Sequence, residues 1–185
     1  CGLRLLASLP LDMSLWYNLG SNIVNAVQPN DELRSAGKFM GLSGYSVPNP
    51  LIVNKLKGLF FEDPFMRGNK DSIDLHKYLN VFDIDIQQTE GFMNSVSDFD
   101  DCAFFSANWQ ETFEQIIMEC IEPFVLKYDF PICLTGGCAL NGLLDERIRK
   151  VTGQEVFVPP NPNDSGLALG GWFLNNWDRI GQYNV

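Results

Sequence analysis

Apolar residues recur at helical spacing in two stretches of the chain, and each stretch predicts an amphipathic helix. The first helix is expected over 12–27, with Asp12 or Ser14 as its N-cap. The second is expected over 107–128, with Ser106 as its N-cap. The apolar stripes consist of Leu15, Leu19, Ile23 and Val27 in the first helix and of Trp109, Phe113, Ile116, Ile117, Cys120, Ile121 and Phe124 in the second.

The region between these two helices has weaker patterns. Residues 35–46 are rich in Gly and Ser, which predicts a loop with a short helix, and 51–61 predicts a small helix. Apolar and polar residues alternate over 81–86, as is typical of a strand. Asp, Asn and Gln are frequent over 62–101, and we expect this stretch to form a peripheral insert.

The C-terminal part of the chain alternates between helical and strand patterns. From 107 to 177 the predicted order is helix, strand, helix, strand and helix, which is typical of α/β layering with buried strands. The strands are expected at 131–134 and 156–158, the middle helix at 140–148 with Gly153 closing it, and the last helix at 164–177. We therefore assign the chain to the α/β class.

Composition and charge narrow the function classes. Of the 185 residues, 45% are hydrophobic and 19% are charged, which suits one domain or one large lobe with a core. The net charge of −10 argues against nucleic acid as the main partner, because an acidic chain repels the phosphate backbone, and it leaves open a local pocket for ATP or a tRNA end. No apolar run approaches the roughly 18 residues of a membrane span, and no secretory signal pattern is found. We expect a cytoplasmic protein without a membrane partner.

Cysteine and histidine content argues against a metal or disulfide framework built from these residue types. The chain has five cysteines without a CxxC pair, and we expect them to be reduced core residues. His76 is the only histidine and is expected to be a surface side chain or one with its hydrogen bonds satisfied. Gln110 and Glu114 lie one turn apart on the predicted helix and are expected to form a polar face.

The segment LTGGCALN, residues 134–141, is the first candidate site. A strand leads into Gly136 and Gly137 and then into a helix, whose free N–H groups suit a phosphate or another anion. Asn141 could bond to a ribose or a base. The alternative is a tight turn in which the glycines serve only the bend.

Asp164, in the segment NPNDSGLALGG, is the second candidate. It lies where a strand ends and a helix begins, the usual ligand edge of an α/β sheet, and its carboxylate could hold a cation. The alternative is an N-cap role for the same carboxylate. The helix that follows is narrow, which implies close packing against another helix or a ligand; its small residues are Gly166, Ala168, Gly170 and Gly171.

Lys38 lies between glycines in GKFMGL and could meet a phosphate, although the spacing is not that of a P-loop. The alternative is a solvated lysine.

The order of these motifs resembles the nodulation-protein-U and cephamycin-carbamoyltransferase family. LTGGCALN followed by VFVPPNPNDSGLALGG is similar to that family's Gly-Gly-x-Ala-Leu-Asn turn, strand, proline and Gly-Asp-Ala-Gly helix. SAGKFMGLSGY looks like its Gly-Lys-x-Met-Gly-Leu-x-x-Tyr segment. Residues 14–17 and the pair Gln110 and Glu114 fall where the family has Ser-Leu-Gly-x-x-Tyr and Gln-x-x-x-Glu. The resemblance covers most of the chain, and 50–100 contributes little.

The resemblance implies the C-terminal lobe of an actin/sugar-kinase-like (ASKHA, ribonuclease-H-like) fold. It implies carbamoyl transfer from carbamoyl-adenylate, made from ATP and carbamoyl phosphate, to a small-molecule alcohol. It also implies a divalent metal, typically iron. By this match Gly136, Gly137 and Asn141 bind the nucleotide, Asp164 binds the metal and Lys38 is the catalytic loop lysine.

The sequence also departs from the family pattern. No His-x-x-x-His occurs, so we expect the other two metal ligands, the N-terminal lobe and the adenylate-forming domain to lie outside this chain, which begins with Cys1. Asn163 and Ser165 replace the glycine and alanine beside the aspartate, and Ser43-Gly44 replaces Ala-Pro. Two alternatives stay open: a relative of the threonylcarbamoyl-tRNA transferases, and a non-catalytic nucleotide-binding or assembly lobe. An exposed apolar face and self-association are expected of such a lobe.

Overall fold

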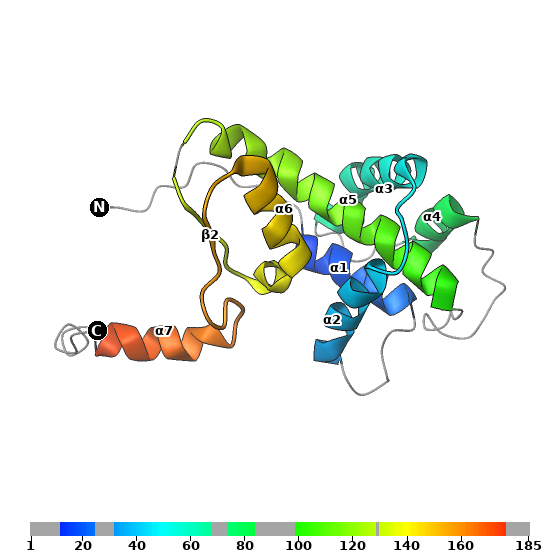
Figure 1. The fold of residues 1–185 in the computed structure, drawn as a ribbon. Coiled ribbons are helices and arrows are strands. Elements are labelled where there is room, and N and C mark those ends of the chain that lie inside the picture. Colours follow the sequence, from blue (N-terminus) through cyan, green and yellow to red (C-terminus); the bar gives the residue numbers. More distant parts are fainter. Residues whose placement is uncertain (1–11, 25–31, 68–73, 84–98, 129, 177–185) are drawn as a thin grey trace. The chain divides into compact units, whose positions relative to one another are not determined.

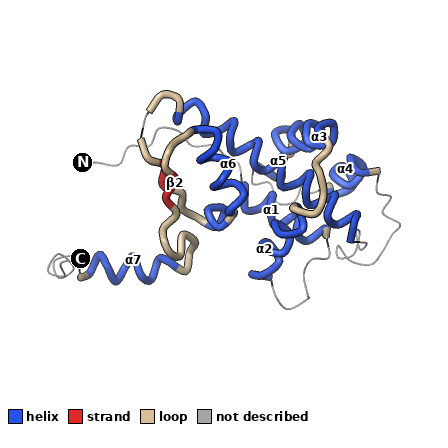
Figure 2. The backbone as a smooth tube through the Cα atoms, in the orientation of Figure 1, coloured by secondary structure: helices blue, strands red, loops and turns tan. Residues whose placement is uncertain are grey.

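The computed structural model describes residues 12–24, 32–67, 74–83, 99–128 and 130–176. These residues are mostly helical, with one short pair of strands (Figure 2). The chain divides into two units, Cys1–Glu119 and Cys120–Val185.

Helix α1 (Met13–Ile23) begins where the pattern predicted it. Asp12 is its N-cap, and the Asp12 carboxylate accepts a hydrogen bond from the Leu15 N–H at 2.9 Å. The helix ends at Ile23 with Val24 as its extended C-cap, so the predicted end near Val27 is too late.

Helix α5 (Phe99–Val125) begins earlier than the apolar stripe indicated. Two acidic residues in its first turn favour the early start, because they complement the positive end of the helix dipole. Ser106 is therefore inside the helix, where its hydroxyl is buried and has no hydrogen-bond partner in the described part of the chain. The prediction of Ser106 as N-cap is wrong.

An aromatic stack between α1 and α5 forms the centre of the first unit, and α1 to α4 gather around the N-terminal part of α5 (Figure 1). The ring centroids of Trp16 and Trp109 are 4.1 Å apart, and those of Trp109 and Phe105 are 5.1 Å apart. The Trp109 indole N–H also donates to the carbonyl of Trp16 at 3.0 Å. A Cβ atom on Gly20 would lie 2.4 Å from the Trp109 indole nitrogen, so this position has no room for a side chain.

Helix α2 (Glu32–Ser43) occupies most of 35–46, for which the sequence predicted a loop with a short helix. Phe39 explains the difference, because its ring is fully buried and meets Tyr17 and Phe105 at centroid distances of 5.4 and 6.4 Å. This burial offsets glycine's helix penalty of about 1 kcal/mol at Gly37 and again at Gly41.

Helix α3 (Pro50–Glu62) confirms the helix predicted over 51–61. Asn49 caps its first turn by accepting from the Leu51 N–H at 2.9 Å. The Asn49 N–H in turn donates to the buried side chain of Asn108 on α5 at 2.7 Å, which fixes the start of α3 on the central helix.

The stretch after α3 contains the short helices η1 (Pro64–Arg67), α4 (Leu75–Leu79) and η3 (Asn80–Phe82). The strand predicted over 81–86 is wrong over 81–83, the part that the structure describes. Asn80–Phe82 form η3 instead, and the ring centroids of Phe82 and Phe105 are 4.5 Å apart. Tyr78 and Leu79 are buried in the core. The peripheral insert expected over 62–101 stays a prediction, because 68–73 and 84–98 lie outside the described residues.

The second unit contains β1 (Ile132–Cys133), η4 (Gly137–Leu140), α6 (Gly142–Thr152), β2 (Val156–Phe157) and α7 (Gly166–Asn175). The strands are parallel, with Ile132 opposite Val156 and Cys133 opposite Phe157. Helix α6 packs against β2 and ends, as predicted, at Gly153, which has a positive φ of 67°. The α/β order predicted for this part of the chain is confirmed.

The cysteines do not all lie in the core. Cys102 is buried as expected, whereas Cys133 on β1 is exposed, which corrects its prediction as a core residue. Among the described helices, none combines the length and apolar content that crossing a bilayer requires.

Candidate functional site

The two strands of the second unit carry their C-terminal loops to one edge. The Ile132 N–H donates to the Glu155 carbonyl at 2.8 Å, and the Leu134 N–H donates to the Phe157 carbonyl at 2.9 Å. Because the strands are parallel, the glycine turn after β1 and the acidic loop after β2 leave the pair at the same end.

Gly136 joins these two segments directly. Its N–H donates to the carbonyl of Pro162 at 2.7 Å, two residues from Asp164 in the sequence. Its φ of 93° and ψ of 172° belong to a region that is essentially restricted to glycine. The turn and the acidic loop are therefore neighbours at one end of the parallel strand pair.

Gly137 follows at the first position of η4 and is exposed. An N–H at this position has no acceptor inside its own helix. A Cβ built on Gly137 meets no atom within 4 Å. Of the two predicted phosphate donors, the Gly136 N–H is engaged with Pro162, and Gly137 is the first residue of η4 with open space where a Cβ would lie.

Asn141 is buried and caps α6. Its side-chain oxygen accepts from the Leu144 N–H at 3.0 Å. The predicted contact with a nucleoside stays a prediction, and this oxygen already serves the helix. An asparagine directly before a helical pattern was the available sequence signal for the capping role.

Asp164 is exposed and does not cap α7. That helix begins at Gly166, and Ser165 occupies the cap position without a side-chain capping bond. Only the backbone carbonyl of Asp164 serves the helix, by accepting from the Leu167 N–H at 3.1 Å. The capping alternative for the Asp164 carboxylate is thus wrong, and the carboxylate is not committed to the helix.

The loop that presents Asp164 is held by close internal contacts. Asn161 has a positive φ of 54°, and a Cβ on Gly166 would lie only 2.2 Å from the Asn161 carbonyl oxygen. The Gly166 N–H donates to the Asn163 carbonyl at 2.9 Å, and the Ser165 hydroxyl donates to the Asn163 side-chain oxygen at 2.5 Å. The smallness of Gly166 is thus required by the loop itself.

The described residues do not make a complete iron site. No group of three or more His, Cys, Asp and Glu side chains able to hold a metal occurs among them. One carboxylate, Asp164, is too few ligands for the three-ligand site that the family resemblance implies.

The other two residues singled out in the sequence lie in the first unit. Lys38 is exposed on α2, a helix rather than the expected loop. His76 is exposed near the start of α4, as predicted.

A buried polar chain in the first unit was missed by the sequence analysis. The Tyr17 hydroxyl donates to the Gln110 side-chain oxygen at 2.6 Å, and the Gln110 amide donates to the Glu114 carboxylate at 2.8 Å. All three side chains are buried, so the predicted polar surface at Gln110 and Glu114 is wrong. The signal was present, because Gln110 follows directly on Trp109 within the apolar part of the helix.

Asp63 is a second buried acid in this unit. It accepts a hydrogen bond from the Tyr78 hydroxyl and pairs with the Lys77 ammonium at 2.5 Å. Burial, followed by the hydrogen bond to Asp63, raises the pKa of the Tyr78 hydroxyl far above its usual range. Asp63 lies at the end of α3 and binds α4 to it.

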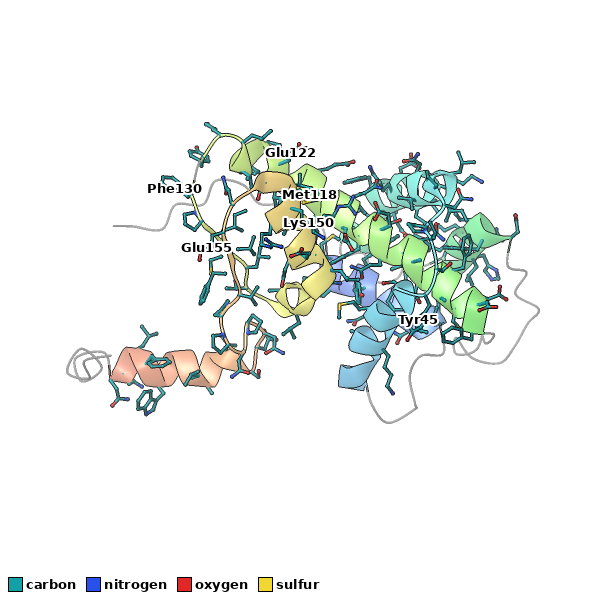
Figure 3. The ribbon with its side chains drawn as sticks, in the orientation of Figure 1. Tyr45, Met118, Glu122, Phe130, Lys150 and Glu155 are labelled. Carbon is teal, nitrogen blue, oxygen red and sulfur yellow. The ribbon has the colours of Figure 1, made fainter. Side chains whose placement is uncertain are left out.

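Large apolar side chains are exposed throughout the second unit. Phe130, labelled in Figure 3, is exposed on the segment before β1, and Phe157 is exposed on β2. Helix α7 buries none of its residues, and its exposed apolar side chains are Leu167, Leu169, Trp172, Phe173 and Leu174. This agrees with the exposed apolar face that we expected of a single lobe.

Comparisons with known proteins agree with the motif order. A family model described as the carbamoyltransferase N-terminus matches residues 5–172. Nodulation protein U of Bradyrhizobium diazoefficiens (strain USDA 110) is 27% identical over 190 residues. The match covers 91% of this chain and 32% of that relative, so the chain spans about a third of the relative's length. No solved structure matches the chain.

Proposed function

This chain belongs to the carbamoyltransferase family, and on that premise we propose that it forms part of an enzyme that carbamoylates a hydroxyl group. The donor is carbamoyl-adenylate, made from ATP and carbamoyl phosphate, and the acceptor is a small-molecule alcohol. We propose that residues 1–185 form the C-terminal lobe of an actin/sugar-kinase-like fold.

The reaction needs a site that holds the leaving phosphate. The acceptor oxygen attacks the carbamoyl carbon, the bond from this carbon to the adenylate oxygen breaks, and AMP leaves with the electron pair. The hydroxyl proton passes to a base or to solvent. A preorganised N–H beside the phosphate stabilises the charge that develops on it. Gly137 is the proposed donor, because the N–H of Gly136 is already bonded to Pro162.

The single observation that carries the proposal is the hydrogen bond from Gly136 to Pro162. It brings the glycine turn and the Asp164 loop together at one strand edge, where α/β proteins bind ligands. Both segments also resemble the family motifs in sequence.

Three further roles are proposals that follow from the family match. Asn141 holds the start of α6 in place beside the nucleotide, which is consistent with its capping bond. Lys38 supplies a positive charge to the donor. Asp164 provides one ligand of a divalent metal such as iron, with the other ligands outside the described residues. When bound, such a metal would supply Lewis-acid chemistry, and the reaction above takes no step through it.

The test is transfer of labelled carbamoyl from carbamoyl phosphate to an alcohol, with ATP, by the whole enzyme of which this chain is part. Gly137→Pro removes the N–H, and proline is tolerated at the first helical position. Loss of such a donor is expected to slow transfer by about 10²-fold or more. Gly137→Ala keeps the N–H and meets no neighbouring atom, so it should lose much less. Equal rates for the two variants would contradict the assignment of Gly137.

A second candidate is favoured by the exposed apolar side chains of α7 and β2. Under this hypothesis the chain is an assembly lobe that binds a partner or a second copy through the exposed apolar side chains of α7 and β2. Sedimentation of the chain, alone and with Trp172→Glu, measures this directly. Concentration-dependent association that the substitution abolishes supports the assembly role, and a monomer at all concentrations rejects it.

A further inference from the structure

We propose that Gly136 is a positioning residue that couples the two loops, so that nucleotide bound at the turn also orders the loop carrying Asp164. The inference rests on the proposed nucleotide site and assigns Gly136 a task other than phosphate binding. Two sites are coupled when a physical element connects them and responds to both. The connection here is the 2.7 Å hydrogen bond from the Gly136 N–H to the Pro162 carbonyl.

The turn side of this connection leaves Gly136 little freedom. Its backbone lies in a region that only glycine readily adopts, and its carbonyl accepts from the Ala139 N–H at 3.1 Å inside η4. Both polar groups of the Gly136 backbone are thus in use, one toward η4 and one toward Pro162. A ligand that fixes η4 therefore also fixes the direction of the N–H that holds the loop.

The loop side is equally constrained. Asn161 is held at positive φ, and its carbonyl oxygen leaves no room for a Cβ on Gly166. The bonds from Gly166 to Asn163 and from Leu167 to Asp164 then carry the loop into α7. Because these contacts restrict the loop, a ligand that reduces the motion of Pro162 also reduces the motion of the Asp164 backbone.

Hydrogen exchange reports the two sides separately. The amides of Ala139 and Asn141 report the turn, since both donate within it, and the amides of Gly166 and Leu167 report the loop. The probe is ADP, added to the full chain. ADP is expected to slow exchange at both sets, by about fivefold or more at the loop, the low end of typical coupling between sites.

Two variants separate coupling from structural damage. Gly166→Ala forces a clash within the loop and leaves every residue of the turn unchanged. It is expected to keep the ADP protection of Ala139 and to lose that of Leu167. Gly153→Ala is the control, because it also strains the second unit with one added methyl group, here through a positive φ at the far end of α6. This control should keep protection at both sets.

The outcomes distinguish this inference from the proposed function. Protection of the turn with no change at the loop of the unmodified chain would overturn the coupling and leave the nucleotide site standing. Protection at neither set would overturn both. Loss of loop protection in Gly153→Ala as well as Gly166→Ala would assign the effect to general destabilisation and reject the role of Gly136.

Discussion

The backbone N–H of Gly136 donates a hydrogen bond to the carbonyl of Pro162 at 2.7 Å. These residues belong to two motifs that lie far apart in the sequence and at the ends of paired parallel strands. The bond needs no side chain, so a comparison of side-chain types alone would not reveal it. It gives the candidate site a defined geometry within the second unit.

The first prediction concerns the aromatic stack. Gly20→Ala places a methyl group against the Trp109 indole and should lower the free energy of unfolding by about 1–3 kcal/mol through overpacking. Gly58→Ala is its matched control on α3, where a Cβ meets nothing within 4 Å, and should raise stability by up to about 1 kcal/mol. Urea unfolding of both variants measures the difference, and equal shifts would contradict the packing described for α1.

The second prediction concerns the buried Asp63. Tyr78→Phe removes a donor to this carboxylate and should cost about 1–3 kcal/mol of unfolding free energy. Tyr45→Phe changes an exposed tyrosine of the same unit and should be within about 0.5 kcal/mol of the unmodified chain. If both substitutions cost the same, the Asp63 bond does not contribute to stability.

The raised pKa of Tyr78 adds a pH dependence to the same pair. The folded chain keeps the Tyr78 proton while the unfolded chain releases it, so stability falls as the pH rises through the ordinary tyrosine range. This loss should be smaller in Tyr78→Phe than in Tyr45→Phe. Thermal unfolding at neutral and alkaline pH provides the comparison.

The third prediction concerns the buried polar chain. Gln110→Leu removes one hydrogen-bond partner from Tyr17 and one from Glu114, and should cost about 2 kcal/mol or more. Gln115→Leu changes a less buried glutamine on α5, directly after Glu114, and should lower the free energy of unfolding clearly less. Equal denaturant midpoints for the two variants would show that the buried polar chain does not contribute to the free energy of unfolding.

The fourth prediction uses two neighbours on α6 with opposite pKa shifts. Burial raises the pKa of Asp145, whose Oδ1 has no hydrogen-bond partner in the described part of the chain. Ionised Asp145 thus opposes folding at pH 7, and this cost disappears as the pH falls through its raised pKa. Asp145→Asn should therefore stabilise the chain at pH 7 and lose this advantage in acid.

Glu146 should behave in the opposite way. Its hydrogen bonds to Arg149 and Lys150 lower its pKa, so its contribution is present at pH 7 and disappears as the pH falls through the lowered pKa. Glu146→Gln should slightly destabilise the chain at pH 7 and have no effect in acid. The effect is small, because the side chain is exposed and solvent screens the pair. Matching pH profiles for the two variants would contradict this account.

The sequence predicted the elements whose pattern is local. The cap at Asp12, the glycine stop at Gly153 and the short apolar strands at 132 and 156 each follow from a few neighbouring residues. In the structure, the parallel pairing of β1 and β2 places the glycine turn and the Asp164 loop at the same edge.

The errors have a common physical cause in tertiary packing. The burial of Phe39 stabilises α2 as a helix, and local helix propensity does not predict this burial. The contact between the Phe82 and Phe105 rings accompanies a helical turn where a strand was expected. Gln110 and Glu114 were assigned to the surface because hydrogen-bond partners such as Tyr17 are distant in sequence. The hydrogen bond from the Gly136 N–H to the Pro162 carbonyl could not be predicted either, since every residue other than proline carries the same backbone N–H.

The most direct measurement is an ADP titration of the full chain followed by amide resonances. The account predicts that the Gly137 N–H shifts most, as the phosphate accepts its hydrogen bond, and that residues 163–167 shift with it. Saturable binding that leaves Gly137 unmoved, or no binding of ADP at all, would contradict the placement of the nucleotide at the glycine turn.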